Sequence, residues 1–251
     1  SQLPPEQRPQ LQAICYGTCR WFHRLDGELN QRLKKPIRKP DRVIHHLMLV
    51  ALFQLRFSEQ ATYAVLNETV EACRALDRPH LTGLVNGVLR AAEREGAPES
   101  SDDSSRYSHP VWMVEKLRHN WPDHWQAILD ANNTQAPMTL RVNALRFSRD
   151  EYLKLLADAG IGAKATRFAP LGIQLERPFP VDNLPWFEDG AVSVQDEAAQ
   201  LCTTLMDLQP GQRVLDTCAA PGGKTCAILE NCAELAEVVA IDESADRLPR
   251  V

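Results

Sequence analysis

The residues best suited to chemistry lie in one short segment, Val-Leu-Asp-Thr-Cys-Ala-Ala-Pro-Gly-Gly-Lys-Thr, at positions 214–225. Residues 213–216 have the composition of a buried strand and residues 224–231 that of a helix, so a turn joins them. Gly222 and Gly223 let a ligand approach the backbone of that turn closely. The free N–H groups at the start of the helix favour an anionic group there. The segment therefore predicts a ligand site at the carboxyl edge of a sheet.

Three classes of ligand could use such a turn. The phosphate loop of nucleotidases requires G-x-x-x-x-G-K-[ST], but Cys218 stands where its first glycine belongs. The dinucleotide pattern G-x-G-x-x-G does not occur. S-adenosylmethionine needs only one tight turn and a distant acid, and Asp242 ends the next predicted strand, 20 residues after Gly222. That is the spacing of a ribose-binding carboxylate, so we expect S-adenosylmethionine and keep the phosphate loop as an alternative.

Each of these residues also has a purely structural interpretation. Asp242 could cap a following helix, and Lys224 could be a solvated residue of the first helical turn. Cys218 and Cys226 could be small core residues. Cys218 has no obvious base near it in the sequence, so we do not expect it to be a nucleophile. The adjacent histidines at 45–46 lie in an apolar helical pattern and are expected to pack.

The first part of the chain is predicted to be an all-α bundle, residues 1–96. Residues 97–108 are small, polar or acidic, and we expect them to form an inter-domain linker. Apolar residues at spacings of three and four predict the helices of the bundle, at 11–25, 42–57, 62–76 and 81–94.

Residues 109–194 are predicted to form a small α+β subdomain, because helical and strand-like patterns alternate there. The helices are expected at 110–120, 121–132 and 149–159, and the strand-like pieces at 138–142, 172–175 and 191–194.

From residue 195 onward the pattern is typical of a βαβ unit. It contains a helix at 196–206 with Asp196 as N-cap, the strand and helix around the glycine turn, a strand at 238–242 and a helix starting at Ser244. One βαβ unit cannot close a sheet. We therefore expect residues 195–251 to be the first, incomplete part of an α/β Rossmann-like domain.

The net charge of −5 is distributed unevenly. Residues 1–95 carry 14 Lys and Arg against 10 Asp and Glu, whereas residues 96–251 carry 14 against 23. The basic half is expected to contact a polyanion, and a solvated loop around Pro36 and Pro40 is the alternative. The residues expected to bind RNA are Arg32, Lys34, Lys35, Arg38 and Lys39.

Several classes of protein are excluded or disfavoured by composition. The longest apolar run, 47–53, is far shorter than the roughly 20 residues that span a bilayer, so no membrane partner is expected. The first residues carry no secretory signal, and the seven cysteines include no Cys-x-x-Cys. We therefore expect a cytoplasmic protein with free thiols and no metal.

Four motifs resemble one family. Asp-Thr-Cys-Ala-Ala-Pro-Gly-Gly-Lys-Thr at 216–225 resembles the RNA cytosine-5 methyltransferases of the NOL1/NOP2/Sun family. Ser-His-Pro-Val-Trp at 108–112, Leu-Arg-Val-Asn at 140–143 and Val-Gln-Asp-Glu-Ala-Ala-Gln at 194–200 look like its other landmarks, in the same order. The front half is similar to NusB-type RNA-binding domains, through Asn-Glu-Thr-Val-Glu at 67–71 and Leu-Val-Asn-Gly-Val-Leu-Arg at 84–90.

This resemblance implies a multidomain S-adenosylmethionine-dependent methyltransferase. Its substrate would be 16S ribosomal RNA or an intermediate of small-subunit assembly, and it would act as a monomer. Asp242 would bind the ribose of the cofactor. The loop around the methionine part would consist of Cys218, Ala219, Ala220, Pro221, Gly222, Gly223 and Lys224.

The reaction implied by the resemblance starts with a cysteine thiolate that adds to C6 of an unstacked cytosine and makes C5 nucleophilic. The family carries its two active cysteines in Asp-Ala-Pro-Cys and Thr-Cys-Ser segments, and neither string occurs here. We therefore expect methyl transfer by the full-length protein, with its nucleophile beyond Val251, and no activity from these 251 residues alone. The alternative is a non-catalytic RNA-binding or ribosome-assembly factor with a degenerate methyltransferase domain.

Overall fold

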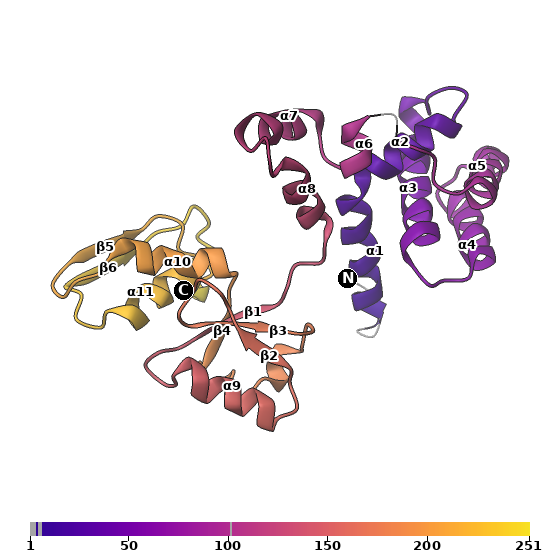
Figure 1. The fold of residues 1–251 in the computed structure, drawn as a ribbon. Helices are drawn as coiled ribbons and strands as arrows, with labels where there is room; N and C mark the ends of the chain where they lie inside the picture. The colour runs from indigo at the N-terminus through magenta and orange to yellow at the C-terminus, as the bar shows by residue number, and fades with distance from the viewer. Residues whose placement is uncertain (1–3, 5–6, 101) are drawn as a thin grey trace. The chain divides into compact units, whose positions relative to one another are not determined.

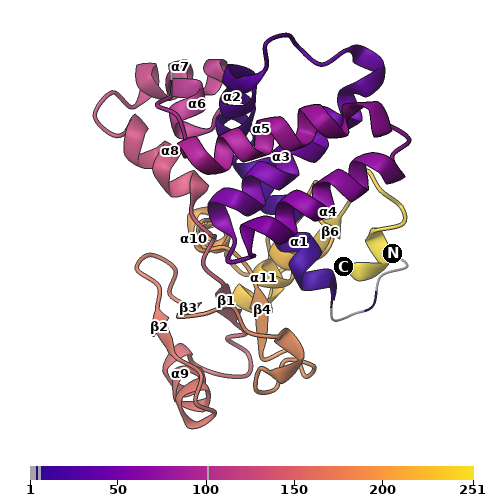
Figure 2. The ribbon, with the colours of Figure 1, turned by 90° about the vertical axis from the view of Figure 1, so that its right-hand side faces the viewer.

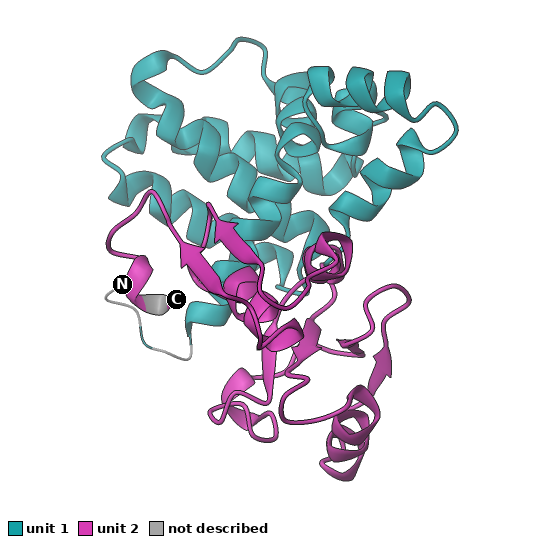
Figure 3. Ribbon diagram, turned by 90° about the vertical axis from the view of Figure 1, so that its left-hand side faces the viewer, with its two compact units in different colours: residues 1–135 teal, residues 136–251 magenta. Residues whose placement is uncertain are grey.

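The computed structural model describes residues 4, 7–100 and 102–251, and it divides the chain into two compact units (Figures 1 and 3). Unit 1 comprises residues 1–135 and unit 2 residues 136–251. Ser101, which belongs to the expected linker, lies outside the described residues. Each unit has an apolar core of its own.

Unit 1 is helical and is organised around α3 (Arg42–Phe57). This helix packs against α1, α2, α4 and α5 (Figure 2). Its apolar spacing places Ile44, Met48 and Leu52 in the core. The other helices of the bundle are α1 (Arg8–Arg20), α2 (Phe22–Arg32), α4 (Thr62–Ala75) and α5 (Thr82–Glu95).

Three of the four helices predicted for residues 1–96, at 42–57, 62–76 and 81–94, are confirmed to within one residue, and the fourth is not. Residues 11–25 do not form one helix, because α1 ends at Arg20 and α2 begins at Phe22. Trp21 between them leaves helical geometry, and its ring stacks on that of Phe57 with 4.9 Å between centroids. The aromatic contact with α3 therefore coincides with the break, which apolar spacing alone does not reveal.

Residues 102–108 differ from the linker expected there. Asp102 accepts the backbone N–H of Ser105 and caps a short helix, α6 (Asp103–Tyr107), which packs against α2. Tyr107 joins Val114 and Leu129 in a small second core. The helices that supply these two residues are α7 (Val111–Asn120) and α8 (Trp125–Asn133), and both lie within unit 1.

Unit 2 begins with a four-stranded antiparallel sheet in the order β2-β3-β1-β4. Leu140 of the central strand pairs with Ile173 on one side and with Val194 on the other. Strand alternation directs Leu140 and Val142 into a core shared with α9 (Arg149–Asp158). The strands are β1 (Thr139–Val142), β2 (Ala163–Ala165), β3 (Gly172–Leu175) and β4 (Val192–Val194).

The second sheet of unit 2 contains the predicted βαβ unit. β5 (Arg213–Asp216) and β6 (Glu237–Ala240) pair in parallel, with α11 (Gly223–Asn231) between them in sequence and α10 (Glu197–Met206) packed on α11. Asp196 caps α10 as predicted, by accepting the N–H of Ala198. The prediction of a helix that starts at Ser244 is wrong. A turn stands there, in which Asp242 accepts the backbone N–H of Ser244, and a short 3-10 helix follows at Leu248–Arg250.

Three further properties concern the described residues alone. None of their helices combines the length and the apolar character needed to cross a bilayer. No group of three or more His, Cys, Asp or Glu side chains among them is arranged to hold a metal ion. The seven cysteines are all free thiols.

The close approach of α1 and α3 at Gly17 leads to a prediction about stability. A Cβ on Gly17 would lie 2.0 Å from the ring of Phe53, so Gly17→Ala should lower the free energy of unfolding by about 1–3 kcal/mol. A Cβ on Gly87 of α5 would meet nothing within 4 Å, so Gly87→Ala should raise it by about 0.5–1 kcal/mol. Urea unfolding of the two variants measures both changes, and equal stabilisation by both would contradict this packing of α1.

Candidate functional site

Asp216, the last residue of β5, ties together the two ends of the glycine turn. One of its carboxylate oxygens accepts the backbone N–H of Cys218 at 3.1 Å, and the other accepts the hydroxyl of Thr225 at 2.7 Å. Asp216 and Thr225 are both buried. The strand therefore holds both the entry to the turn and the first turn of α11.

The turn itself is tight at Gly222. Its φ of +101° is one that residues with a side chain rarely adopt, and its N–H donates to the carbonyl of Ala219 at 2.6 Å. The carbonyl of Gly222 accepts the N–H of Cys226, which is the first hydrogen bond of the helical ladder. The N–H groups of residues 223–225 therefore have no partner within the helix and carry the positive end of its dipole.

Asp242 lies directly beside this turn, as its sequence spacing predicted. Its two carboxylate oxygens accept the backbone N–H groups of Ser244 and Ala220, each at 3.0 Å, and Arg247 donates to the carbonyl of Ala220 at 2.8 Å. The pKa of Asp242 lies below its ordinary value, and the bond from Ser244 is the largest cause. Burial, the next largest, opposes it, and the bond from Ala220 and the charge of Arg247 lower the pKa further. Asp242 is thus ionised at neutral pH, and its oxygens keep lone pairs for further donors.

The remaining predicted cofactor residues contribute mainly backbone. Ala219 and Ala220 are buried, whereas Cys218, Pro221 and Lys224 are exposed at the turn. The exposed side chain of Lys224 fits the solvated interpretation as well as contact with a ligand. The structure therefore brings residues 218–224 and Asp242 together in one place.

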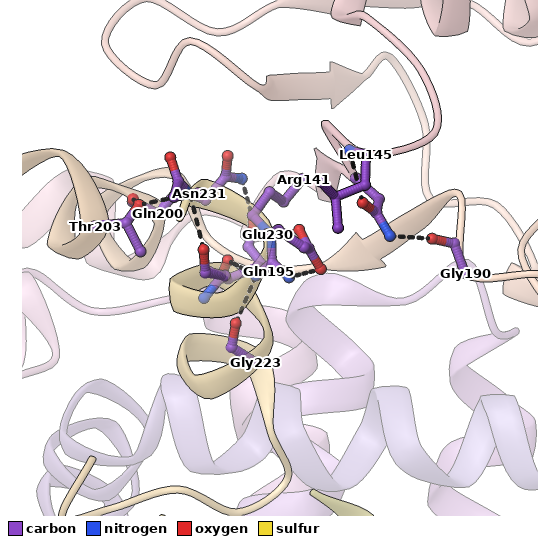
Figure 4. A network of polar contacts seen from close by, with 11 residues as sticks. Arg141, Leu145, Gly190, Gln195, Gln200, Thr203, Gly223, Glu230 and Asn231 are labelled. Atoms are coloured by element: carbon purple, nitrogen blue, oxygen red, sulfur yellow. Dashed lines mark hydrogen bonds and ion pairs between the residues drawn. The ribbon is translucent and has the colours of Figure 1, made fainter. Parts of the chain in front are cut away.

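Sequence analysis named no role for Arg141, yet its side chain is the centre of the polar network behind the turn (Figure 4). Only 2% of this side chain is exposed. Its Nε and Nη2 atoms donate to the two carboxylate oxygens of Glu230, at 3.1 and 2.9 Å. Its Nη1 atom donates to Oε1 of Gln195 and to the carbonyl of Gly223, both at 2.5 Å. All three nitrogens of the guanidinium are therefore used.

Three of the landmark motifs meet in this network. Arg141 comes from the motif at 140–143, Gln195 from the motif at 194–200, and Gly223 from the glycine turn. Gln200 adds a second link, because its amide donates to the carbonyls of Leu140 and Gln195. A charged residue in the middle of an otherwise apolar strand was the one sequence signal that could have drawn attention to Arg141.

Glu197, the first residue of α10, makes another link between the two sheets of unit 2. Its carboxylate accepts the backbone N–H groups of Phe168 and Ala169, at 2.5 and 3.0 Å. These bonds lower its pKa, with the bond from Phe168 as the larger cause. The loop between β2 and β3 is therefore attached to the start of α10.

The basic segment of unit 1 divides into one buried and four exposed residues. Arg32 is only 8% exposed, forms an ion pair with Glu28 and donates to the carbonyl of Gly96 at 2.6 Å, so it holds α2 to the end of α5. Asp41, the one acid in the segment, pairs with Arg78 at 2.8 Å. The exposed residues are Lys34, Lys35, Arg38 and Lys39.

Comparison with known families matches three consecutive parts of the chain. Residues 1–94 match the NusB family, residues 109–182 the ferredoxin-like domain of RsmF/B-like methyltransferases, and residues 203–251 the 16S rRNA methyltransferase RsmB/F family. Curated relatives match along the whole chain. The ribosomal RNA small subunit methyltransferase B of Pseudomonas putida is 49% identical over 254 residues, and that of Yersinia enterocolitica is 45% identical over 252 residues.

Along its whole length the chain is similar to methyltransferases of the RsmB/F type. The resemblance of its motifs is thereby confirmed, as is the NusB-like helical first part. Within the region predicted as an α+β subdomain, residues 109–182 match a ferredoxin-like domain. The chain spans 58% of the length of both relatives. The crystal structure of PH0851 shares the fold, with a TM-score of 0.76 and 20% sequence identity over all of this chain and 58% of that one.

The lowered pKa of Asp242 predicts a pH dependence of stability. Because the folded pKa lies below the unfolded value, the carboxylate stabilises the fold above about pH 4, and this contribution is lost as the pH falls through the folded pKa. The difference in unfolding free energy between wild type and Asp242→Asn should therefore be largest near neutral pH and shrink below about pH 4. Denaturant unfolding at several pH values measures it. The neighbouring exposed variant Glu243→Gln is the control, and an Asp242→Asn difference independent of pH would contradict the assignment.

Proposed function

We propose that the full-length protein transfers a methyl group from S-adenosylmethionine to C5 of a cytosine in 16S ribosomal RNA, in the cytoplasm. The observation that carries this proposal is the pairing of the Gly222 turn with the carboxylate of Asp242, joined through the N–H of Ala220 at 3.0 Å. Similarity to a family described as 16S rRNA methyltransferases supports the substrate class.

The residues of the turn fit the two polar ends of S-adenosylmethionine. The N–H groups at the start of α11 would hold the carboxylate of the methionine part. Asp242, ionised and with lone pairs to spare, would accept the ribose hydroxyls. When bound there, the cofactor supplies the methyl group as an electrophile.

The chemistry on the base needs a nucleophile that activates C5. We assign it to a cysteine thiolate of the full-length protein. The thiolate would add to C6, and C5 would then take the methyl group as the methyl–sulfur bond of the cofactor breaks and its thioether leaves. A base would remove the C5 proton, and the thiolate would leave as the aromatic ring is restored. Cys218 is not given this role, because it belongs to the turn around the cofactor. The 251-residue chain alone is expected to leave RNA unmethylated.

The cofactor site predicts a specific loss of affinity. In the full-length protein, Asp242→Ala should raise the KM for S-adenosylmethionine by roughly tenfold or more, because charged hydrogen bonds to the ribose are lost. Glu243→Ala, which removes an exposed carboxylate one residue away, should leave the KM unchanged. The assay follows radioactive methyl transfer to 16S rRNA and to immature small subunits, with 5-methylcytosine identified by mass spectrometry.

Two outcomes of that assay would contradict the proposal. A full-length wild type that binds S-adenosylmethionine but methylates neither substrate would favour the non-catalytic RNA-binding factor. An Asp242→Ala variant with unchanged KM would remove Asp242 from the cofactor site.

We also propose that the exposed part of the basic segment contacts RNA phosphates. Changing Lys34, Lys35, Arg38 and Lys39 to Gln should weaken binding of a 16S rRNA transcript. The slope of log affinity against log salt should fall by about 1 for each side chain that contacts a phosphate. Filter binding across a series of salt concentrations measures both quantities.

The matched control removes the same charge elsewhere on the surface. It changes four exposed basic residues outside the segment to Gln, and it should leave the salt slope nearly unchanged. An equal effect of the two sets would mean that overall charge, and not this segment, governs binding. The control residues are Lys116, Lys154, Lys164 and Arg177.

A further inference from the structure

We propose that Arg141 is a positioning residue for the cofactor turn, an inference that rests on the cofactor site of the proposed function. Arg141 does not belong to the turn and is 82 residues from Gly223 in sequence. It acts on the turn through the backbone, by holding the carbonyl of Gly223 at 2.5 Å.

That carbonyl determines where a ligand-facing donor points. A peptide group is planar, and its C=O and N–H are directed oppositely, so the group that carries the carbonyl of Gly223 also carries the N–H of Lys224. Lys224 is the second residue of α11, where the N–H has no partner within the helix. When Arg141 holds the carbonyl from behind, the N–H of Lys224 is directed towards the open end of the helix.

The guanidinium can do this because two other side chains fix its own position. Glu230, seven residues after Gly223, accepts two of its hydrogen bonds from the last turn of the same helix. Long side chains of a helix lean towards its N-terminus, which lets Glu230 reach back to Arg141. Gln195 accepts a bond from the side, and a Cβ on Gly223 would lie 3.6 Å from its amide nitrogen.

Side chains on two sides of the turn therefore bind its main chain. Asp242 and Arg247 bind the N–H and the carbonyl of Ala220 on the side of β6. Arg141 binds the carbonyl of Gly223 on the side of β1. The ferredoxin-like sheet thus contributes directly to the geometry of the cofactor turn, although its residues lie outside the turn.

The test separates positioning from ordinary stabilisation with two variants of the full-length protein. Arg141→Lys keeps the charge beside Glu230 but lacks the rigid fork that reaches Glu230 and Gly223 together. It should raise the Kd of S-adenosylmethionine, measured by calorimetry, by about tenfold or more. Glu230→Gln removes the charge partner but keeps an oxygen that accepts from Arg141 and leaves the bond to Gly223, so it should lower the melting temperature with a much smaller rise in Kd than Arg141→Lys.

A readout that needs no cofactor comes from the peptide group itself. Loss of the hydrogen bond to the carbonyl of Gly223 should shift the amide nitrogen resonance of Lys224, observed after selective ¹⁵N-lysine labelling. Arg141→Lys should shift it, and Glu230→Gln should not. If wild type binds no S-adenosylmethionine, the proposed function fails, and this shift still decides whether Arg141 orients the peptide group.

A double variant and a surface control complete the design. Arg141→Met with Glu230→Met removes the buried ion pair and fills its space with apolar atoms, which favours a folded protein, yet it cannot hold Gly223. It should bind S-adenosylmethionine as weakly as Arg141→Lys. Arg213 forms an exposed pair with Glu237 across β5 and β6. Arg213→Lys should change neither the Kd of S-adenosylmethionine nor the amide nitrogen resonance of Lys224.

Two results would overturn the proposal. One is a folded double variant that binds S-adenosylmethionine as tightly as wild type. The other is a rise in Kd that is proportional to the fall in melting temperature, with the same proportion in Arg141→Lys and Glu230→Gln. That result would make Arg141 a stabilising residue only.

Discussion

The burial of one guanidinium constrains the whole of unit 2. A charge removed from water is tolerated only when hydrogen bonds and an opposite charge replace the water, and Arg141 donates four such bonds. Its partners come from both ends of α11 and from the junction between β4 and α10. The first sheet, the junction and the helix after the glycine turn can therefore adopt only the arrangement in which these groups converge.

On the side of β6, the turn is also held by hydrogen bonds with charged side chains. There the carboxylate of Asp242 binds backbone N–H groups, and a second arginine, Arg247, binds a backbone carbonyl. The turn is thus shaped by contacts to its main chain, and the side chains of Cys218 and Lys224 remain exposed. A site built in this way depends on backbone orientation more than on the identity of the side chains that line it.

Local patterns predicted the local features well. The span of α3, the strand β5 and the cap at Asp196 follow from apolar spacing and capping preference, which act over a few residues. The glycine turn and its spacing to Asp242 predicted that these parts of the candidate site lie together, as the bond between Asp242 and Ala220 shows. Contacts between distant residues have no such signature, and Arg141 was therefore missed as a site residue although its motif was noted.

The count of charges placed Arg32 wrongly among the exposed basic residues, for a related reason. Arg32 belongs to the basic segment by sequence, but its side chain lies against Glu28 and the end of α5. A count of charges cannot distinguish a cation that faces solvent from one that joins two helices. The break at Trp21 and the short helix α6 were missed for the same reason, because aromatic stacking and burial against α2 decide them.

The network around Arg141 also affects the order of events during synthesis. Glu230 follows Arg141 by 89 residues, which a ribosome adds in roughly 4 to 18 s at typical rates of about 5–20 residues per second. Gln195 and Gly223 are added before the end of that interval, but until Glu230 follows the nascent β1 carries a cation without its opposite charge, so the first sheet cannot settle fully around it. Unit 1 consists of helices with neighbouring contacts and can fold meanwhile, whereas the ferredoxin-like sheet must wait for α11.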